Sequence, residues 1–466
     1  MMENLEKKTK FNIYLFFAIA AAVCGLMMSL IIPVSQVPDE YTHFELMLRA
    51  YGAEKMYGED LKEFYRPAGM ESFNSGDAHS VDGDAYLNSG MKSYSEGLFG
   101  YGFKPGITAV RFIPQAVGFF LGVLLRLPIL ICHQLGELTA LIFYILICLI
   151  ALKKMPFKKE VLCFIMLMPM AMQEAASFSP DVTVNALCFL LTAMIFDFKV
   201  REKKVGWKEM ILFALFTGLV LIAKEIYILV AFGIFIVPLD KFSLKIGEKL
   251  DLAVFIKKYR LLFVAVLILI AVILGILCRD FRYVKVLYAA VLQPGRTFLL
   301  FKNTLLGYKD FYLQTLVGSF GWLDSAVSYT FVTVFFMMLF FVNLFQSKKS
   351  IELQSGFTTA NRIYLIILSA AIFVFVFISM ISWSFYLAGV NFDGGVAEYR
   401  SYLYQIDYML GVQGRYFIPF MPMLIVSLGR GNEAKSMKRY TVIQACYYVI
   451  SIIIVLRILY VRYWGM

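Results

Sequence analysis

Polar residues that could take part in chemistry stand in short stretches between the long apolar runs of this chain. The first stretch carries Asp39 and Glu40 directly after Pro38, with His43 one helical turn further on. A carboxylate held where lipid meets water can act as a general base on an acceptor hydroxyl. The same acids could instead only stabilise the positive end of a helix that begins there. The spacing of these residues leaves both alternatives open.

Metal binding is a third alternative for this stretch, because Asp39 and His43 are four residues apart and would share one helix face. Two ligands are too few for a protein metal site, and the sequence offers no obvious third. The seven cysteines are scattered singly without a CxxC pair, which argues against a zinc site and a disulfide framework. We therefore predict no metal ligand in this chain.

Three later stretches place charged residues at the ends of apolar runs. Asp181 follows a turn at Pro180, where it would either cap a helix or add a second carboxylate to the site. Lys224 would either pair with its neighbour Glu225 or supply a cation suited to a phosphate. Arg415 would either extend toward lipid headgroups or hold a substrate phosphate with its guanidinium fork.

The apolar runs that position these residues identify an integral membrane protein. Of the 466 residues, 60% are hydrophobic and only 17% are charged, and the mean hydropathy is +0.73. Apolar runs long enough to cross about 30 Å of hydrocarbon recur along most of the chain, each bounded by Lys and Arg. The net charge of +11 lies in these short loops and forms no continuous stripe, so we expect no nucleic-acid partner.

The charge pattern predicts a cytoplasmic N-terminus, with residues 11–32 as a retained first span. Residues 33–106 then form a long outer loop, which holds twelve acidic residues and six basic ones, the reverse of the balance in the whole chain. Within this loop, Phe44, Met47, Leu48 and Tyr51 recur at helical spacing, which predicts an amphipathic helix on the membrane surface.

The other basic clusters can all face the cytoplasm in one threading with eleven spans. After the first span, the remaining ten are expected at about residues 135–152, 160–174, 182–198, 209–223, 226–239, 261–278, 327–346, 363–383, 414–429 and 440–458. Residues 107–131 do not fit as a full span, so we interpret them as interfacial or as a short re-entrant pair, broken at Pro114 and Pro128. The prediction is an all-α protein with about 11–13 transmembrane helices in a single membrane domain, residues 1–466.

Several motifs, taken in order, resemble the bacterial membrane-protein family catalogued as domain of unknown function 2142. They cover nearly the whole chain. The motifs are Pro38-Asp39-Glu40 with His43-Phe44, Ser179-Pro180-Asp181 with Asn185, Ala223-Lys224 with Tyr227, Gly321-Trp322-Leu323-Asp324, and Gln413-Gly414-Arg415-Tyr416-Phe417 with Pro419. The layout is also similar to that of the GT-C class of integral-membrane glycosyltransferases, which use polyprenyl-phosphate-linked sugars.

The resemblance to the GT-C class implies roles for the polar residues. Asp39 would be the base, Glu40 its partner and Asp181 a second acidic group, so these three are the candidate catalytic residues. Lys224 and Arg415 would hold the lipid phosphate. The full set of candidate substrate-binding residues is His43, Lys224, Arg296, Asp324, Gln413, Arg415 and Tyr416.

By this resemblance, the chain would move a sugar from a polyprenyl-phosphate donor to a cell-envelope glycan, lipid or protein on the outer face of the cell membrane. No cofactor is identified, and a divalent metal would be tolerated but not required, because cationic side chains can stabilise the departing phosphate. Two alternatives remain open, namely a transporter or flippase of a lipid-linked or small polar substrate, and a non-catalytic protein of envelope assembly.

Overall fold

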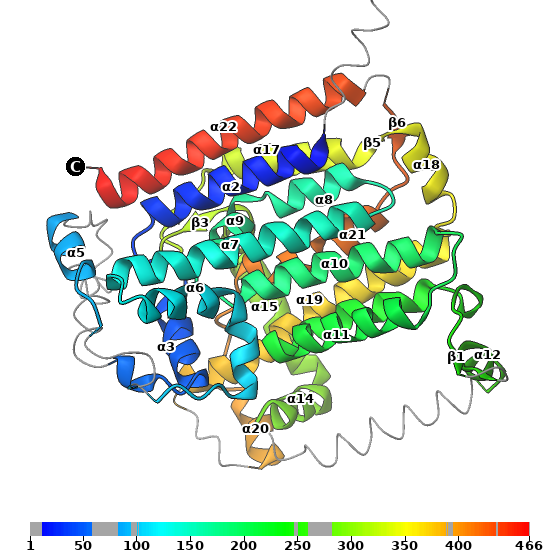
Figure 1. The fold of residues 1–466 in the computed structure, drawn as a ribbon. Coiled ribbons are helices and arrows are strands. Elements are labelled where there is room, and N and C mark those ends of the chain that lie inside the picture. Colours follow the sequence, from blue (N-terminus) through cyan, green and yellow to red (C-terminus); the bar gives the residue numbers. More distant parts are fainter. Residues whose placement is uncertain are drawn as a thin grey trace, which may run out of the picture.

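Long helices lie side by side in the computed structural model of this protein (Figure 1), which describes residues 12–57, 83–94, 100, 102–246, 250–259, 282–387, 389, 395–434 and 437–465. Within these ranges, six helical segments are long and apolar enough to cross a membrane. They are α2 (Ile13–Ile31), η4 with α6 (Ile107–Leu124), α7 (Ile129–Lys154), α10 (Asp181–Val200), α19 (Thr359–Leu387) and the stretch Tyr440–Trp464 of α22 (Met437–Trp464). The predicted all-α, multi-pass membrane fold is confirmed.

Several predicted spans form helices that are shorter or interrupted. Single short helices occupy three of them, namely α11 (Trp207–Ala223), η5 (Glu225–Ile236) and α17 (Tyr329–Leu344). Two others are each divided in two, into α8 (Lys159–Met166) and α9 (Pro169–Ala175), and into η7 (Gly414–Phe420) and α21 (Met421–Ser427). Proline explains both divisions, because Pro169 and Pro422 each stand in the first turn of a new helix. The predicted span at 261–278 lies outside the described residues.

Residues 107–131, predicted to be interfacial or a short re-entrant pair, form a helical segment whose two ends both lie at the end of the bundle where α10 begins. Helix η4 (Ile107–Phe112) continues directly into α6 (Ile113–Leu124), and together they meet the length and apolarity of a span. Pro114 does not break this segment, because it lies in the first turn of α6, where a missing N–H costs no hydrogen bond. The chain does turn before Pro128, which precedes α7.

Helix α10 is the central element of the bundle, since 94% of its apolar stretch is buried in the protein. It is packed by α7, α11, η5 and η7, and it carries Asp181 at its first turn. Near its other end, Asp197 forms ion pairs with Lys154 and Arg201. The two ends of α10 therefore mark two opposite ends of the molecule.

Shorter elements flank and connect the long helices (Figure 1). The helices are α3 (Glu40–Ala50), η1 (Glu54–Tyr57), α5 (Gly83–Gly90), η6 (Leu239–Lys241), α12 (Leu252–Lys258), α14 (Arg282–Leu292), α15 (Pro294–Gly307), α16 (Lys309–Val317), α18 (Lys348–Gln354) and α20 (Val396–Tyr402). Three two-residue strand pairs join loops: antiparallel β1 (Lys245–Ile246) with β2 (Leu250–Asp251), antiparallel β3 (Ser319–Phe320) with β4 (Ser325–Ala326), and parallel β5 (Phe345–Gln346) with β6 (Asn432–Glu433).

The amphipathic helix expected after the first span is α3, and its predicted apolar face is buried. Phe44 makes edge contacts with Phe119 of α6 and with Phe178, and Tyr51 lies against Phe120 of α6. Protein rather than lipid therefore covers this face, which fixes α3 across the end of the bundle where α10 begins.

Candidate functional site

Arg415, at the start of η7, is the centre of a buried cluster of charged residues. Its side chain is 1% exposed. One guanidinium nitrogen, Nη2, donates to Oδ2 of Asp39 at 2.5 Å, while Nη1 donates to the carbonyl of Pro38 at 3.2 Å. Nη1 also lies 3.7 Å from Oε1 of Glu174 on α9. Arg415 is thus held by protein groups and does not extend toward lipid headgroups.

Asp39 reaches Arg415 because its backbone is left-handed, with φ of 63° and ψ of 6°. Asp39 stands at the N-cap of α3, yet its carboxylate makes no capping hydrogen bond to the helix. Its side chain remains 45% exposed while the guanidinium beside it is buried. The carboxylate therefore faces both a fixed cation and open space, which a purely capping residue would not do.

A second ion pair, between Lys224 and Asp181, lies next to the first. Lys224 follows the last residue of α11, and its ammonium also lies 4.8 Å from the ring centre of Tyr416. Arg415 lies over the same ring at 5.4 Å, and the Tyr227 hydroxyl donates to the Tyr416 carbonyl at 2.8 Å. The Tyr416 ring therefore contacts both cations. Lys224 pairs with Asp181 at the start of α10 and not with its neighbour Glu225.

His43 completes one wall of this cluster from the second turn of α3. Burial, together with the nearby Lys224 ammonium, lowers its pKa to about 4. The imidazole is therefore neutral at neutral pH, and it can accept or donate a hydrogen bond without adding charge.

Part of this cluster borders a cavity of about 210 Å³, whose lining does not include Arg415 or Asp181. Its polar wall is formed by Asp39, His43, Lys224, Tyr227 and Tyr416, and its apolar wall by Ile226, Val376 and Met380, with Ser379 between them. The cavity is large enough for a phosphate or for part of a sugar ring.

A separate apolar groove lies next to this cavity. Ile226 and Ser379 line both spaces. The groove has a volume of about 290 Å³ and runs between η5, α14 and α19, with walls that include Leu229, Val286 and Phe375. Glu225 also lines it, which separates this residue from its neighbour Lys224. A polar cavity with an apolar groove beside it is suited to an amphiphile.

A second buried cluster lies behind the first and contains Glu40, His133 and Glu137. His133 Nε2 lies 3.8 Å from Oε1 of Glu40 and 3.5 Å from Oε1 of Glu137. From the sequence, Glu40 is expected to act beside Asp39, whereas His133 and Glu137 are not among the predicted site residues. Their spacing of four residues inside an apolar run was the available signal, because polar groups in a span are costly.

Two short backbone segments supply residues to both clusters. Asp39 and Glu40 are neighbours whose carboxylates point into different clusters, and the turn at residues 177–181 supplies Phe178 to one cluster and Asp181 to the other. The Gln115 amide holds this turn by donating to the carbonyls of Ser177 and Ser179 at 3.2 and 2.8 Å.

Three sequence candidates lie away from the cavity. Arg296 donates to the carbonyls of Leu403 and Ile406, at 2.9 and 2.7 Å. Asp324 pairs with Arg462 of α22 at 2.7 Å.

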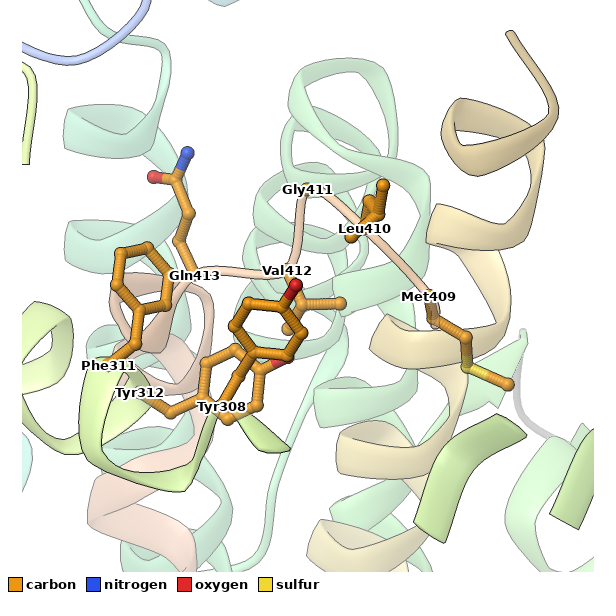
Figure 2. Close-up of a pocket in the computed structure, with 8 residues that line it drawn as sticks. All are labelled: Tyr308, Phe311, Tyr312, Met409, Leu410, Gly411, Val412 and Gln413. Atoms are coloured by element: carbon orange, nitrogen blue, oxygen red, sulfur yellow. The ribbon is translucent and has the colours of Figure 1, made fainter. Parts of the chain in front are cut away.

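Gln413, the third of these, lines a separate cavity of about 190 Å³ between α16 and residues 409–413. Figure 2 shows its amide pointing away from the rings of Tyr308 and Tyr312. The structure therefore brings together His43, Lys224, Arg415 and Tyr416, with Asp39 and Asp181, but leaves Arg296, Asp324 and Gln413 elsewhere.

Comparison with known proteins identifies one matching family. No curated protein and no solved structure matches the chain. One family model does match, over residues 23–424, a range that includes both clusters and most of the bundle. The chain belongs to the family described as predicted membrane protein (DUF2142).

Proposed function

We propose that this protein is a membrane glycosyltransferase that uses a polyprenyl-phosphate-linked sugar on the extracytoplasmic side. The observation that carries the proposal is that the charged cavity and the apolar groove lie next to each other and share Ile226 and Ser379 as lining residues. A polyprenyl-phosphate sugar has the same division, with a charged phosphate and polar sugar at one end and a hydrocarbon chain at the other.

The charged residues and the apolar groove would bind different parts of the donor. Lys224 lines the cavity and would receive the donor phosphate, while the Arg415 guanidinium holds the Asp39 carboxylate beside it. The isoprenoid chain would lie in the groove beside Leu229 and Phe375. When no donor is bound, Asp181 pairs with Lys224, and Asp39 and Glu174 pair with Arg415.

Asp39 has the exposure and chemistry expected of the general base. Its carboxylate would accept the proton of an acceptor hydroxyl while that oxygen attacks the anomeric carbon of the sugar. The bond between this carbon and the phosphate oxygen breaks, and the polyprenyl phosphate leaves with the electron pair. Attack from the face opposite the phosphate inverts the anomeric configuration.

The test is transfer of sugar by the Asp39→Asn variant. Membranes containing the protein would be given a radiolabelled panel of undecaprenyl-phosphate hexoses and pentoses, and label in envelope acceptors would be counted. Loss of a general base should lower the transfer rate by about 100- to 10,000-fold. Glu45→Gln is the matched control, because Glu45 also lies on α3 but pairs with Arg49 on the helix surface.

Two outcomes would contradict the proposal. One is unchanged transfer by Asp39→Asn when the variant inserts and folds like the unaltered protein. The other is movement of the labelled lipid across proteoliposomes without any transferred sugar, which would identify a flippase instead.

A further inference from the structure

We propose that Glu40, His133 and Glu137 form a binding site for one divalent transition-metal ion, of the kind represented by Zn²⁺ and Mn²⁺. The site lies behind the charged cavity and is separate from it. The inference does not depend on the proposed glycosyltransferase activity, because it rests on the donor atoms and their surroundings.

The donor atoms have the type and spacing that a metal ion requires. One imidazole nitrogen and two carboxylate oxygens lie within 4.8 Å of one another. The separations of 3.5 and 3.8 Å from His133 Nε2 exceed the N–H···O distance of about 2.7–3.2 Å. They are close to the distance of about 3.3 Å between two ligands that bind zinc tetrahedrally at about 2.0 Å.

The elements that carry these ligands are held firmly. His133 and Glu137 stand one turn apart on α7, so both side chains leave the same face of the helix. Glu40 is the first residue of α3 and comes from the opposite side. A small inward movement of its side chain would complete the three-ligand set, with water or another group in the fourth position.

Charge balance favours a cation at this place. All three side chains are at most 5% exposed, and in the part of the chain that the structure describes, neither glutamate forms an ion pair with Lys or Arg. Two carboxylates and a protonated imidazole would leave one uncompensated negative charge. Two carboxylates, a neutral imidazole and a divalent ion sum to zero, which costs less in a buried site.

The groups around the ligands orient them as outer partners do in metal sites. The Ser29 hydroxyl of α2 donates to Oε2 of Glu137 at 2.5 Å. The backbone N–H groups of Phe178 and Val37 donate to the two oxygens of Glu40, at 3.1 and 3.3 Å.

His133 is placed by packing in the same way. The Phe178 ring lies against its imidazole, with the ring centres 4.2 Å apart. Each of the three proposed metal ligands is therefore oriented by a residue that is not itself a ligand.

A metal ion at this site would help to fix the position of Asp39, which lines the neighbouring cavity. Glu40 is bonded to Asp39 through one peptide, and the Asp39 backbone is already constrained to φ of 63°. An ion that fixes Glu40 against α7 would hold the turn at residues 37–40, and with it the Asp39 carboxylate beside Arg415. Glu40 would then act on the cavity as a positioning residue.

Metal analysis of the full-length protein tests the proposal directly. The protein would be purified in detergent without chelator, incubated with Zn²⁺ or Mn²⁺, desalted and measured by inductively coupled plasma mass spectrometry. The expected result is about one ion per chain, with a higher melting temperature than after treatment with EDTA. The His133→Ala and Glu137→Gln variants should each lose the ion.

The control and the unaltered protein keep the proposal falsifiable even if a variant fails to fold. His43→Asn removes a histidine from the same end of the bundle but from the other cluster, so it should retain the ion. The proposal is overturned if the unaltered protein holds no ion and EDTA leaves its melting temperature unchanged. It is also overturned if well-folded His133→Ala protein keeps the same metal content.

Discussion

Two adjacent acids, Asp39 and Glu40, serve different clusters because of one backbone conformation. The left-handed geometry at Asp39 turns its carboxylate toward Arg415, while Glu40 begins α3 and reaches toward His133. Aspartate tolerates this conformation better than most residues other than glycine. An acidic pair in a sequence therefore does not establish that the two side chains act together.

His43 gives a pH-dependent prediction at the residue scale. Burial and the Lys224 ammonium lower its pKa from 6.5 to about 4 in the folded protein. Between these values the unfolded chain binds more protons than the folded one, so stability should fall as the pH drops from 6.5 toward 4. The slope should reach at most about 1.4 kcal/mol per pH unit.

The comparison of the unaltered protein with His43→Asn isolates this contribution. Melting temperatures in detergent would be measured from pH 7 to pH 4. The curve of the unaltered protein should fall more steeply below pH 6.5, because asparagine cannot take up the proton. Parallel curves for the two proteins would show that His43 does not titrate in this way.

Sequence patterns singled out the charged residues of this cluster but not which of them form pairs. Asp39, Asp181, Lys224 and Arg415 stand out because charge beside apolar runs is costly and rare. The pairing of Lys224 with Asp181 instead of Glu225 depends on how α11 meets α10, which a single sequence does not specify.

His133 and Glu137 were missed for a related reason. They lie near the start of α7, just after the segment 107–131 that the charge pattern did not assign to a span, and their partner Glu40 is distant in the chain. These three residues are close in space because α3 crosses the end of α7, an arrangement that the sequence alone does not predict.

At the scale of elements, glycines explain the close packing of α6 on α7. A Cβ on Gly118 would overlap the backbone carbonyl of Leu135, and one on Gly122 would lie 2.9 Å from Cα of Cys132. The Gly118 N–H also donates to the Thr139 hydroxyl at 3.1 Å. Small residues allow two helix backbones to approach in this way.

Substitution of Gly118 tests that contact. Gly118→Ala should destabilise the protein by about 1–3 kcal/mol, because the backbone of α7 would have to move. Gly218→Ala on α11 is the control, since its Cβ would meet no atom within 4 Å and the change should stay below about 1 kcal/mol. Equal melting temperatures for the two variants in detergent would contradict the predicted contact.

The segment 107–131 shows why the elements were only partly predictable. The charge pattern argues against an extra span there, because such a span would move Lys153 and Lys154 to the outer side of the membrane. Charge patterns report the side of a loop but not the depth that a helix reaches. The structure agrees with that side, because the segment begins beside Thr183 and ends next to the first turn of α7, but it shows one continuous helical segment packed on α7 through glycines and not a pair broken at Pro114.

At the scale of the whole molecule, basic segments from distant parts of the sequence gather at one end of the bundle. Lys158 donates to the carbonyl of Gly429 at 2.6 Å, and Lys241 donates to that of Arg201 at 2.6 Å. The charged cavity lies at the other end, where α10 begins with Asp181. About 30 Å separates the two ends of this 20-residue helix, which is the thickness of the hydrocarbon layer.

This arrangement predicts that the cavity opens on the extracytoplasmic side, because basic loops remain in the cytoplasm. Cysteine labelling in intact cells would measure it, in a Cys278→Ser, Cys446→Ser background. Asp407→Cys, at a side chain 82% exposed, should react with a membrane-impermeant maleimide. Glu202→Cys, in the exposed turn after α10, should react only after the cells are opened. The reverse pattern would place the cavity in the cytoplasm, where an acceptor in the outer envelope could not reach Asp39.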